Sequence, residues 1–336
     1  MRGRRSIIGT MGTLVLSFFV AGCAVPVANF STPSPVYAPS GAIPVPTGAY
    51  WGGWANPGGT NINSMPTVIE SNTEALEAQL GQTLRVHMHY HNWGSGTTPS
   101  FPDAAMQSDI TEGRTPLVTW ACGDTNAIVT SGADDQLIIN TAIAVKQFGA
   151  PMFIRWYWEM NLAAGTNGQS CMGTGGAAGY IAAWKHIYNI FVAQGVTNVS
   201  WLWNPAYGSA SDADPAPYYP GAQYVDWLGF DGYDKVNAND FGAIYNHFHT
   251  EFGPYGKPVL IAETGECAAE QAAYIAGAQA EIEGQSNPGN YSFPEIKGFV
   301  YFSAPGQTSP CPWTLTGSGI TAFASMGTDP YWQPVP

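Results

Sequence analysis

Positively charged residues are scarce in this sequence. Its 336 residues include 11 Lys and Arg against 24 Asp and Glu, which gives a formal net charge of −13. Such a surface repels nucleic acid and anionic lipid headgroups, because both are recognised mainly through positive charge. The shortage of basic residues argues against a nucleic-acid partner and favours a neutral substrate.

Long hydrophobic runs are also missing. The most apolar segment, residues 7–20, is too short for an ordinary transmembrane helix, and it follows the arginines of the sequence MRGRR. It ends in VAGC, which resembles a bacterial lipoprotein signal that makes Cys23 the lipidated first residue. An ordinary secretory signal or an uncut anchor is the alternative. We expect a signal peptide over residues 1–22 and a chain anchored by lipid to the outer face of a bacterial membrane, or released from it.

Cysteine is rare, and paired C-x-x-C motifs are absent. Of the five cysteines, four remain after Cys23 is set aside. An even number in an exported chain predicts two disulfides, whereas structural zinc sites normally need closely spaced ligands. We therefore expect neither a metal nor another cofactor.

Charge is absent from residues 23–48, which are rich in Pro, Ser and Ala. This composition is typical of an extended tether. No second linker and no repeat follow, so we expect one domain over residues 49–336, acting as a monomer.

Within that domain, short buried runs alternate with helical patterns. Eight runs are predicted to be strands: 49–54, 84–93, 115–122, 151–159, 198–205, 225–233, 257–265 and 297–304. Apolar residues at steps of three and four predict helices at 66–81, 134–149 and 177–195, with weaker patterns at 239–252 and 268–283. The alternation favours an α/β fold, the (β/α)₈ TIM barrel. A doubly wound sheet is less favoured, because WGGWANPGG lacks the spacing of a phosphate-binding loop.

Active sites of such barrels lie at the carboxyl ends of the strands. Polar and aromatic residues at the predicted strand ends are therefore candidates, namely His89, His91, Trp93, Arg155, Trp158, Glu159, Asn161, Trp203, Asn204, Asp231, Tyr233 and Glu263. We expect substrate to be bound by seven of them, namely His89, His91, Trp93, Trp158, Trp203, Asn204 and Asp231, and the others to react or to support the reacting groups.

Two glutamates that end different strands are the parts a glycosidase needs. One carboxylic acid protonates the leaving oxygen, and the other attacks the anomeric carbon or activates water. Tryptophans beside Glu159 favour its protonated form, which suits the acid, whereas hydrogen bonds to Glu263 suit a nucleophile. The alternative is that one of the two is only the ion-pair partner of Arg155.

Four segments carry a family resemblance. They are RWYWEMN (155–161), WLWNP (201–205), YYPGAQYVDWLGFDGYD (218–234) and GKPVLIAETG (256–265). In this order they resemble glycoside hydrolase family 26, whose best-known members are secreted β-mannanases with a retaining mechanism. The resemblance extends over roughly residues 49–304.

The resemblance implies roles for individual residues. Glu159 matches the acid/base and Glu263 the nucleophile, while Arg155 and Tyr233 match the residues that support the nucleophile, and Asn161 follows the acid/base as in the family. Trp158 departs from the family, which usually has His at that position. The family's aromatic run after the acid/base is likewise replaced, here by residues 162–171.

Histidines recur at alternate positions of HMHYH (87–91), which places them on one face of a strand. We expect His89 and His91 to contact substrate or the carboxylates rather than a metal. Trp203, beside Asn204, is the favoured sugar platform, although a tryptophan more often packs between strands and helices.

The sequence therefore predicts a retaining glycoside hydrolase that cleaves a β-linked polysaccharide internally, with β-1,4-mannan as the first candidate. The same machinery acting on β-glucan, xylan or an envelope polysaccharide is one alternative, and a non-catalytic carbohydrate-binding protein is another. Neighbouring barrel loops favour the disulfides Cys122–Cys171 and Cys267–Cys311.

Overall fold

The computed structural model describes residues 41–59, 66–162, 171–207, 213–234, 240–287, 289–305 and 311–334. The expected signal peptide, Cys23 and the first part of the expected tether lie outside the described residues.

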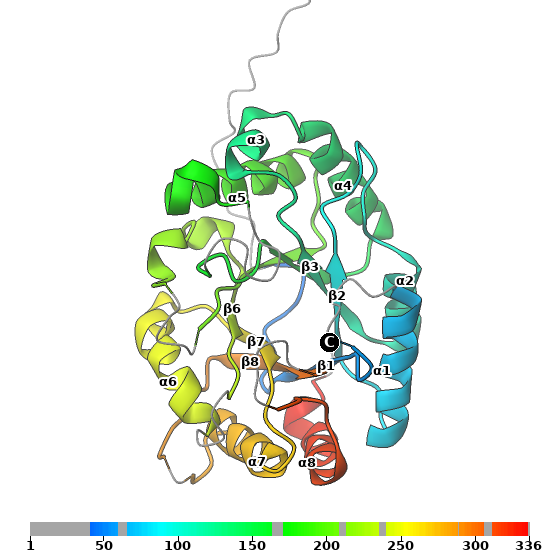
Figure 1. Cartoon of the computed structure of the whole chain (residues 1–336), viewed down its shortest axis with the longest axis vertical. Coiled ribbons are helices and arrows are strands. Elements are labelled where there is room, and N and C mark those ends of the chain that lie inside the picture. The colour runs from blue at the N-terminus through cyan, green and yellow to red at the C-terminus, as the bar shows by residue number, and fades with distance from the viewer. Residues whose placement is uncertain are drawn as a thin grey trace, which may run out of the picture. The chain divides into compact units, whose positions relative to one another are not determined.

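Eight parallel strands form a closed barrel, with helices outside the ring of strands (Figure 1). Each strand pairs with the next along the chain, and β1 pairs with both β2 and β8, which closes the sheet. The strands are β1 (Tyr50–Ala55), β2 (Val86–His91), β3 (Thr115–Trp120), β4 (Met152–Trp156), β5 (Val199–Trp203), β6 (Trp227–Asp231), β7 (Val259–Thr264) and β8 (Ile296–Ser303). All eight predicted strands and the predicted (β/α)₈ fold are confirmed.

The α-helices of the described residues connect these strands. They are α1 (Pro66–Leu80), α2 (Ala104–Glu112), α3 (Asn126–Ser131), α4 (Asp135–Phe148), α5 (Gly176–Ala193), α6 (Phe241–Phe252), α7 (Gln271–Ile282) and α8 (Gly317–Thr328). Gly149 ends α4 in a left-handed conformation that glycine adopts without strain, as predicted. The sequence did not predict α2, α3 or α8, which are short or begin with glycine and serine. No helix in the described part of the chain is long and apolar enough to span a membrane.

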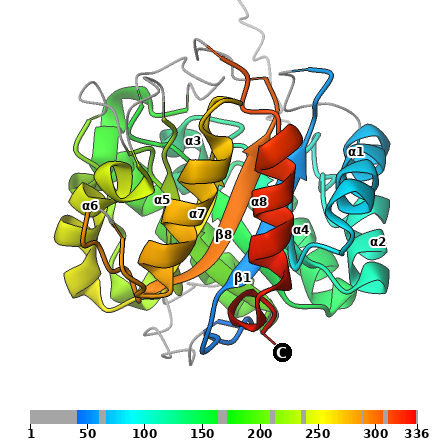
Figure 2. The ribbon, with the colours of Figure 1, turned by 90° about the horizontal axis from the view of Figure 1, so that it is seen from below.

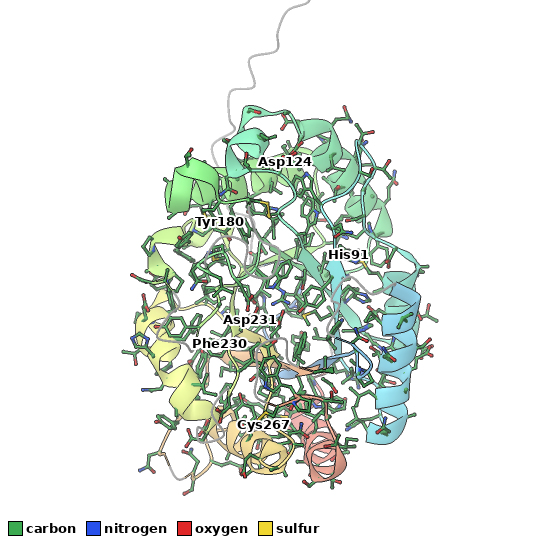
Figure 3. The ribbon with its side chains drawn as sticks, viewed as in Figure 1. His91, Asp124, Tyr180, Phe230, Asp231 and Cys267 are labelled. Carbon is green, nitrogen blue, oxygen red and sulfur yellow. A yellow bond between two sulfur atoms is a disulfide. The ribbon has the colours of Figure 1, made fainter. Side chains whose placement is uncertain are left out.

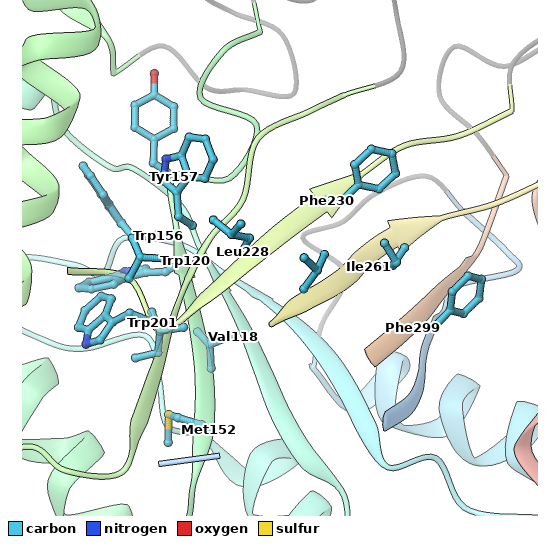
Figure 4. Close-up of a cluster of buried hydrophobic side chains, with 14 of the residues drawn as sticks. Val118, Trp120, Met152, Trp156, Tyr157, Trp201, Leu228, Phe230, Ile261 and Phe299 are labelled. Carbon is cyan, nitrogen blue, oxygen red and sulfur yellow. The ribbon is translucent and has the colours of Figure 1, made fainter. Parts of the chain in front are cut away.

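The core has two apolar layers, because the strands are buried on both faces. Side chains inside the barrel form one cluster, including Met88, Phe153 and Leu202. The other cluster fills the space between strands and helices, and Figure 4 shows its members Trp156 and Trp201 beside β4 and β5. Figure 2 shows α7 and α8 covering β8 and β1 from outside in the same way. This packing gives the strand ends a rigid frame.

The last residues of the expected tether pack against the barrel. The Ile43 side chain is buried, its N–H donates to Ser200 Oγ at 2.9 Å, and the Gly41 N–H donates to Asp226 at 3.1 Å. These contacts lie beside the start of β5 and just before β6, at the end of the barrel opposite the candidate active site. Residues 41–48 are therefore part of the folded barrel unit.

Candidate active site

Glu263, near the carboxyl end of β7, is surrounded by hydrogen-bond donors. Its Oε1 accepts from the Tyr90 hydroxyl at 2.5 Å and from the Arg155 guanidinium, and its Oε2 accepts from the Tyr233 hydroxyl at 2.5 Å. The carboxylate is only 5% exposed. Donors from three other strands or strand ends thus fix the orientation of one carboxylate at the mouth of the barrel.

Arg155 on β4 joins two buried carboxylates. One of its terminal nitrogens contacts both oxygens of Asp231 at 3.0 and 2.9 Å, and the other contacts Glu263. Its Nε donates to Thr119 Oγ1 at 2.7 Å. A fully buried guanidinium is tolerated only when it is paired and hydrogen-bonded, and here those partners hold it against Glu263.

Glu159 lies in a tight turn just after β4. Its φ is 54° and that of Tyr157 is 49°, in the left-handed region that residues with a Cβ rarely occupy. The Glu159 N–H donates to the carbonyl of Asn204 at 2.8 Å, which anchors the turn to the end of β5. Strained backbone held by its surroundings is a common feature of functional sites.

The carboxylates of Glu159, Asp231 and Glu263 come together. One oxygen from each lies within 4.8 Å of the others, and all three residues are buried. Because Arg155 binds both Asp231 and Glu263, Glu159 faces a carboxylate whose position is fixed. One oxygen of Glu159 and one oxygen of Glu263 thus lie close enough for both carboxyl groups to reach the same glycosidic bond.

Electrostatics keep the donors to Glu263 protonated. Burial, reinforced by the charge of Glu263, raises the pKa values of Tyr90 and Tyr233 well above the ordinary value. Burial by itself would lower the pKa of Arg155, but Asp231 and Glu263 outweigh it and raise that pKa. Both phenols therefore remain donors across the physiological pH range.

The structure corrects the prediction for the histidines of β2. His87 and His89 face outward, where their rings contact Asp109 of α2 at 2.8 and 2.5 Å. His91 lies on the same outer face, beside Phe101, with ring centroids 5.3 Å apart. Figure 3 shows His91 on the β2 side of the barrel and Asp231 on the β6 side. His89 and His91 therefore support β2 from behind instead of contacting substrate.

Two predicted sugar-binding tryptophans are part of the core. Trp203 is completely buried and packs against Phe252 of α6, with ring centroids 5.4 Å apart. Trp93 stacks on Trp120 with centroids 4.5 Å apart. Both predictions were wrong, because these side chains lie in the layer between strands and helices.

Asn204, Asp231 and Asn161 position other groups. The Asn204 side chain accepts from Arg155 at 3.4 Å, and Asp231 binds Arg155 through both oxygens. The Asn161 side chain donates to the carbonyls of Ala206 and Ala213, each at 2.8 Å. We predicted that Asn204 and Asp231 contact substrate, but in the structure they hold Arg155. Asn161 supports the turn that carries Glu159.

Trp158 does lie in the site. Its ring meets the Tyr90 ring edge-on at 5.4 Å, and the Arg155 guanidinium lies 5.8 Å from its centroid. The side chain is 5% exposed. The Trp158 ring thus covers the ion pair of Arg155 and Glu263. The family usually has His at this position.

Two residues beside Glu263 and Tyr233, namely Tyr90 and Trp313, were not predicted from the sequence. Tyr90 alternates with the three histidines, so the same pattern that grouped them also places it on the opposite face of β2. Trp313 follows β8 and stacks on the Tyr233 ring with centroids 3.9 Å apart. It lies in a loop without periodicity, and no sequence signal could have identified it.

Two disulfides brace the loops around the site, with the predicted pairing. Cys122–Cys171 joins the loops after β3 and β4, and Cys267–Cys311 joins those after β7 and β8. Figure 3 shows Cys267 between α7 and the barrel.

Among the described residues, two groups are close enough to hold a metal ion: Glu159 with Asp231 and Glu263, and His87 with His89 and Asp109. In the first group Arg155 already supplies the positive charge.

A closed (β/α)₈ barrel with two facing glutamates, one of them fixed by an arginine and two phenols, has the architecture of a barrel glycoside hydrolase. Comparison with known proteins agrees with this class. Residues 37–274 match the family described as Glycosyl hydrolase family 26. The chain therefore belongs to this family of glycoside hydrolases.

Relatives differ in what their names say about substrate. Endoglucanase H of Acetivibrio thermocellus is 25% identical over 249 residues, which make up 68% of this chain and 26% of that protein. The chain thus spans about a quarter of the length of this curated relative.

Solved structures share the fold. A mannanase of Bacillus subtilis is 16% identical with a TM-score of 0.57, covering 85% of this chain and 86% of that one. The family 26 domain of an endo-β-mannanase/endo-β-glucanase from Prevotella bryantii is 14% identical with a TM-score of 0.55, covering 85% and 91%.

Proposed function

We propose that this glycoside hydrolase cleaves a β-linked polysaccharide internally and with retention of configuration. The supporting observation is that oxygens of Glu159 and Glu263 lie within 4.8 Å of each other, a separation that suits double displacement. The coordinated donors on Glu263 count against a protein that only binds carbohydrate, because binding alone does not require an oriented carboxylate.

In the first step, Glu159 donates a proton to the glycosidic oxygen as Glu263 attacks the anomeric carbon. The bond to the leaving sugar breaks, and a glycosyl ester forms on Glu263. Arg155 and the two phenols hold the attacking oxygens in place, so that little reorganisation is needed when the bond forms.

In the second step, Glu159 acts as a base. It takes a proton from a water molecule that attacks the anomeric carbon from the side that the leaving sugar vacated. The ester bond to Glu263 breaks and the carboxylate is restored. Two inversions give a product with the configuration of the substrate.

β-1,4-mannan is the first candidate substrate, in keeping with the family resemblance and the mannanase structures. β-glucan is the second, because the curated relative is named an endoglucanase and Trp158 replaces a polar family residue next to Tyr90. A panel of β-mannan, β-glucan and β-xylan with product analysis decides between them. Release of oligosaccharides from none of the three would contradict the proposal.

We also propose that the chain is exported and held at the membrane by lipid on Cys23, with residues 24–40 as tether. The charged leader, the apolar run and VAGC support this proposal. Labelling cells with a fatty-acid analogue tests it. Label should appear on the wild-type chain and be lost in Cys23→Ser, whereas equal labelling of both chains would contradict it.

A further inference from the structure

The carboxyl half of β2, which carries Tyr90, is paired with a neighbouring strand on one side only. Among the described residues, β1 and β2 are in register at two positions, of which the last joins Gly53 to His87. On the other side, β3 stays paired with β2 up to His91 and Trp120. Beyond His87, β2 therefore lacks one of the two neighbours that normally fix a strand in a closed barrel.

A buried carboxylate of α2 holds this half of β2 from outside the barrel. Asp109 is fully buried, and its two oxygens contact Nδ1 of His87 at 2.8 Å and Nε2 of His89 at 2.5 Å. Burial by itself would raise the pKa of Asp109, but the two histidines outweigh it and lower that pKa. Because an ionised carboxylate only accepts hydrogen bonds, both ring nitrogens are donors, and the orientation of both rings is fixed.

The carboxylate and the rings are themselves held by two further elements. Arg114, just before β3, donates to Asp109 Oδ1 at 3.2 Å and to Glu70 of α1 at 2.8 Å. Burial lowers the pKa of His87, so its second nitrogen, Nε2, accepts from the hydroxyl of Thr73 on α1 at 2.9 Å. Hydrogen bonds thus fix the outer face of β2 to α1, α2 and the start of β3.

Tyr90 follows His89 in the chain and lies on the opposite face of β2, in the active site. Its hydroxyl donates to Glu263 at 2.5 Å, and its ring meets the rings of Trp54 and Trp158 edge-on, each with centroids 5.4 Å apart. These ring contacts restrict the tilt of the phenol. Its position along and across the strand depends on the backbone that it shares with His89, because successive strand residues move together.

We propose that His89 and Asp109 are positioning residues that hold the Tyr90 hydroxyl against the carboxylate of Glu263. The inference rests on the proposed role of Glu263 as the nucleophile. The two residues act through the backbone of β2, where their hydrogen bond takes the place of the pairing with β1 that ends at His87. Misplacement of a catalytic group by roughly 1 Å can lower a rate by up to about a hundredfold, so a small displacement of β2 is enough to matter.

Substitutions at His89 separate its hydrogen bond from the space that it fills. Gln carries an amide N–H that reaches about as far as Nε2 of histidine, whereas Leu fills the space and donates nothing. The turnover number is measured on whichever of β-mannan, β-glucan and β-xylan the wild-type protein cleaves best. It should fall about tenfold in His89→Leu and stay within about threefold of the wild type in His89→Gln. Equal losses in the two variants would overturn the proposal.

A matched control removes a histidine that is bonded to a carboxylate elsewhere. His249 of α6 contacts Glu295, just before β8, at 2.6 Å. This contact lies at the amino ends of the strands, opposite the active site. His249→Leu should leave the turnover number unchanged, and a tenfold loss there would show that the effect is not particular to β2.

The Tyr90→Phe background tests whether the effect passes through the tyrosine hydroxyl. With no hydroxyl left to position, adding His89→Leu should lower the turnover number by no more than about twofold. A general loosening of β2 would lower it by the same factor in both backgrounds, and that result would overturn the positioning role. The free energy of unfolding in urea should instead fall by the same amount in both backgrounds, because the lost bond to Asp109 is the same.

A shorter amide covers the case in which His89→Leu does not fold. His89→Asn is then compared with His89→Gln in both backgrounds, because the asparagine side chain is too short to reach Asp109. Equal losses in the two backgrounds would again overturn the positioning role and leave the role of Glu263 intact. A wild-type protein that cleaves none of the three polysaccharides would instead contradict the proposed function, and the positioning role with it.

Discussion

Arg155 and Glu263 lie 108 residues apart in the sequence and form an ion pair at the mouth of the barrel. The same guanidinium binds Asp231 through both of its oxygens, so one cation is shared by two buried carboxyl groups. The arginine in RWYWEMN therefore pairs with glutamate on a distant strand, and Glu159 in the same motif faces that glutamate across a short gap.

Replacing Arg155 with Met should destabilise the protein strongly. It leaves Glu263 and Asp231 buried without their cation, and breaking a buried pair typically costs about 3–5 kcal/mol. The free energy of unfolding in urea measures the loss. Arg85→Met, which removes a partly buried arginine bound to Gln333, should cost about 1 kcal/mol or less. Equal losses in the two variants would contradict the pairing account.

Tyr90→Phe should lower the turnover number and leave the fold intact. The substitution removes one hydrogen bond to Glu263 and keeps the ring that packs on Trp158. Hydrogen bonds to charged groups contribute about 1.5–3 kcal/mol, which corresponds to roughly a 10- to 150-fold loss. Tyr188→Phe, on the outer side of the barrel, is the matched control. Unchanged turnover in Tyr90→Phe would show that this donor is dispensable.

His91 should make the protein less stable in acid. Burial lowers its pKa to about 4, so between pH 6.5 and 4 the unfolded chain binds a proton that the native state does not. Stability should therefore fall by roughly 1.4 kcal/mol per pH unit as the pH drops through this range. His91→Gln should reduce this dependence and the exposed His247→Gln should not. Identical profiles for both variants would contradict the prediction.

The disulfide between Cys267 and Cys311 should stabilise the barrel near the nucleophile loop. It closes a segment of 44 residues, and removing a link of this kind typically costs about 2–4 kcal/mol. A variant with both cysteines changed to Ser should lose that amount in thermal or urea unfolding. Stability equal to the wild type in this double variant would show that the link is not required.

The fold could be predicted because the strands are short runs rich in apolar and aromatic residues and most of them alternate with helical patterns. Glu159 and Glu263 could be predicted because a parallel barrel brings the carboxyl ends of all its strands to one mouth. This prediction does not depend on which face of a strand each residue occupies. The long-range partner of Arg155 came from family resemblance, since spacing alone left Glu159 and Glu263 as equal alternatives.

The errors have a common physical cause. Strands of a parallel barrel are buried on both faces, so alternation groups residues by face and does not tell the inner face from the outer one. The prediction that His89 and His91 share one face of β2 is confirmed, but that face is the outer one and not the one facing the site. Tyr90 lies on the opposite face and was therefore not predicted to be in the site. Trp203 and Trp93 were misplaced for the same reason.

Trapping the glycosyl-enzyme tests the central claim most directly. A 2-deoxy-2-fluoro glycoside with a dinitrophenyl leaving group slows the second step, so a covalent adduct should accumulate. The mass of the wild-type protein should rise by one fluorosugar unit, and peptide mapping should place it on Glu263. An adduct on another residue, or hydrolysis of the natural substrate with inverted configuration, would contradict the account.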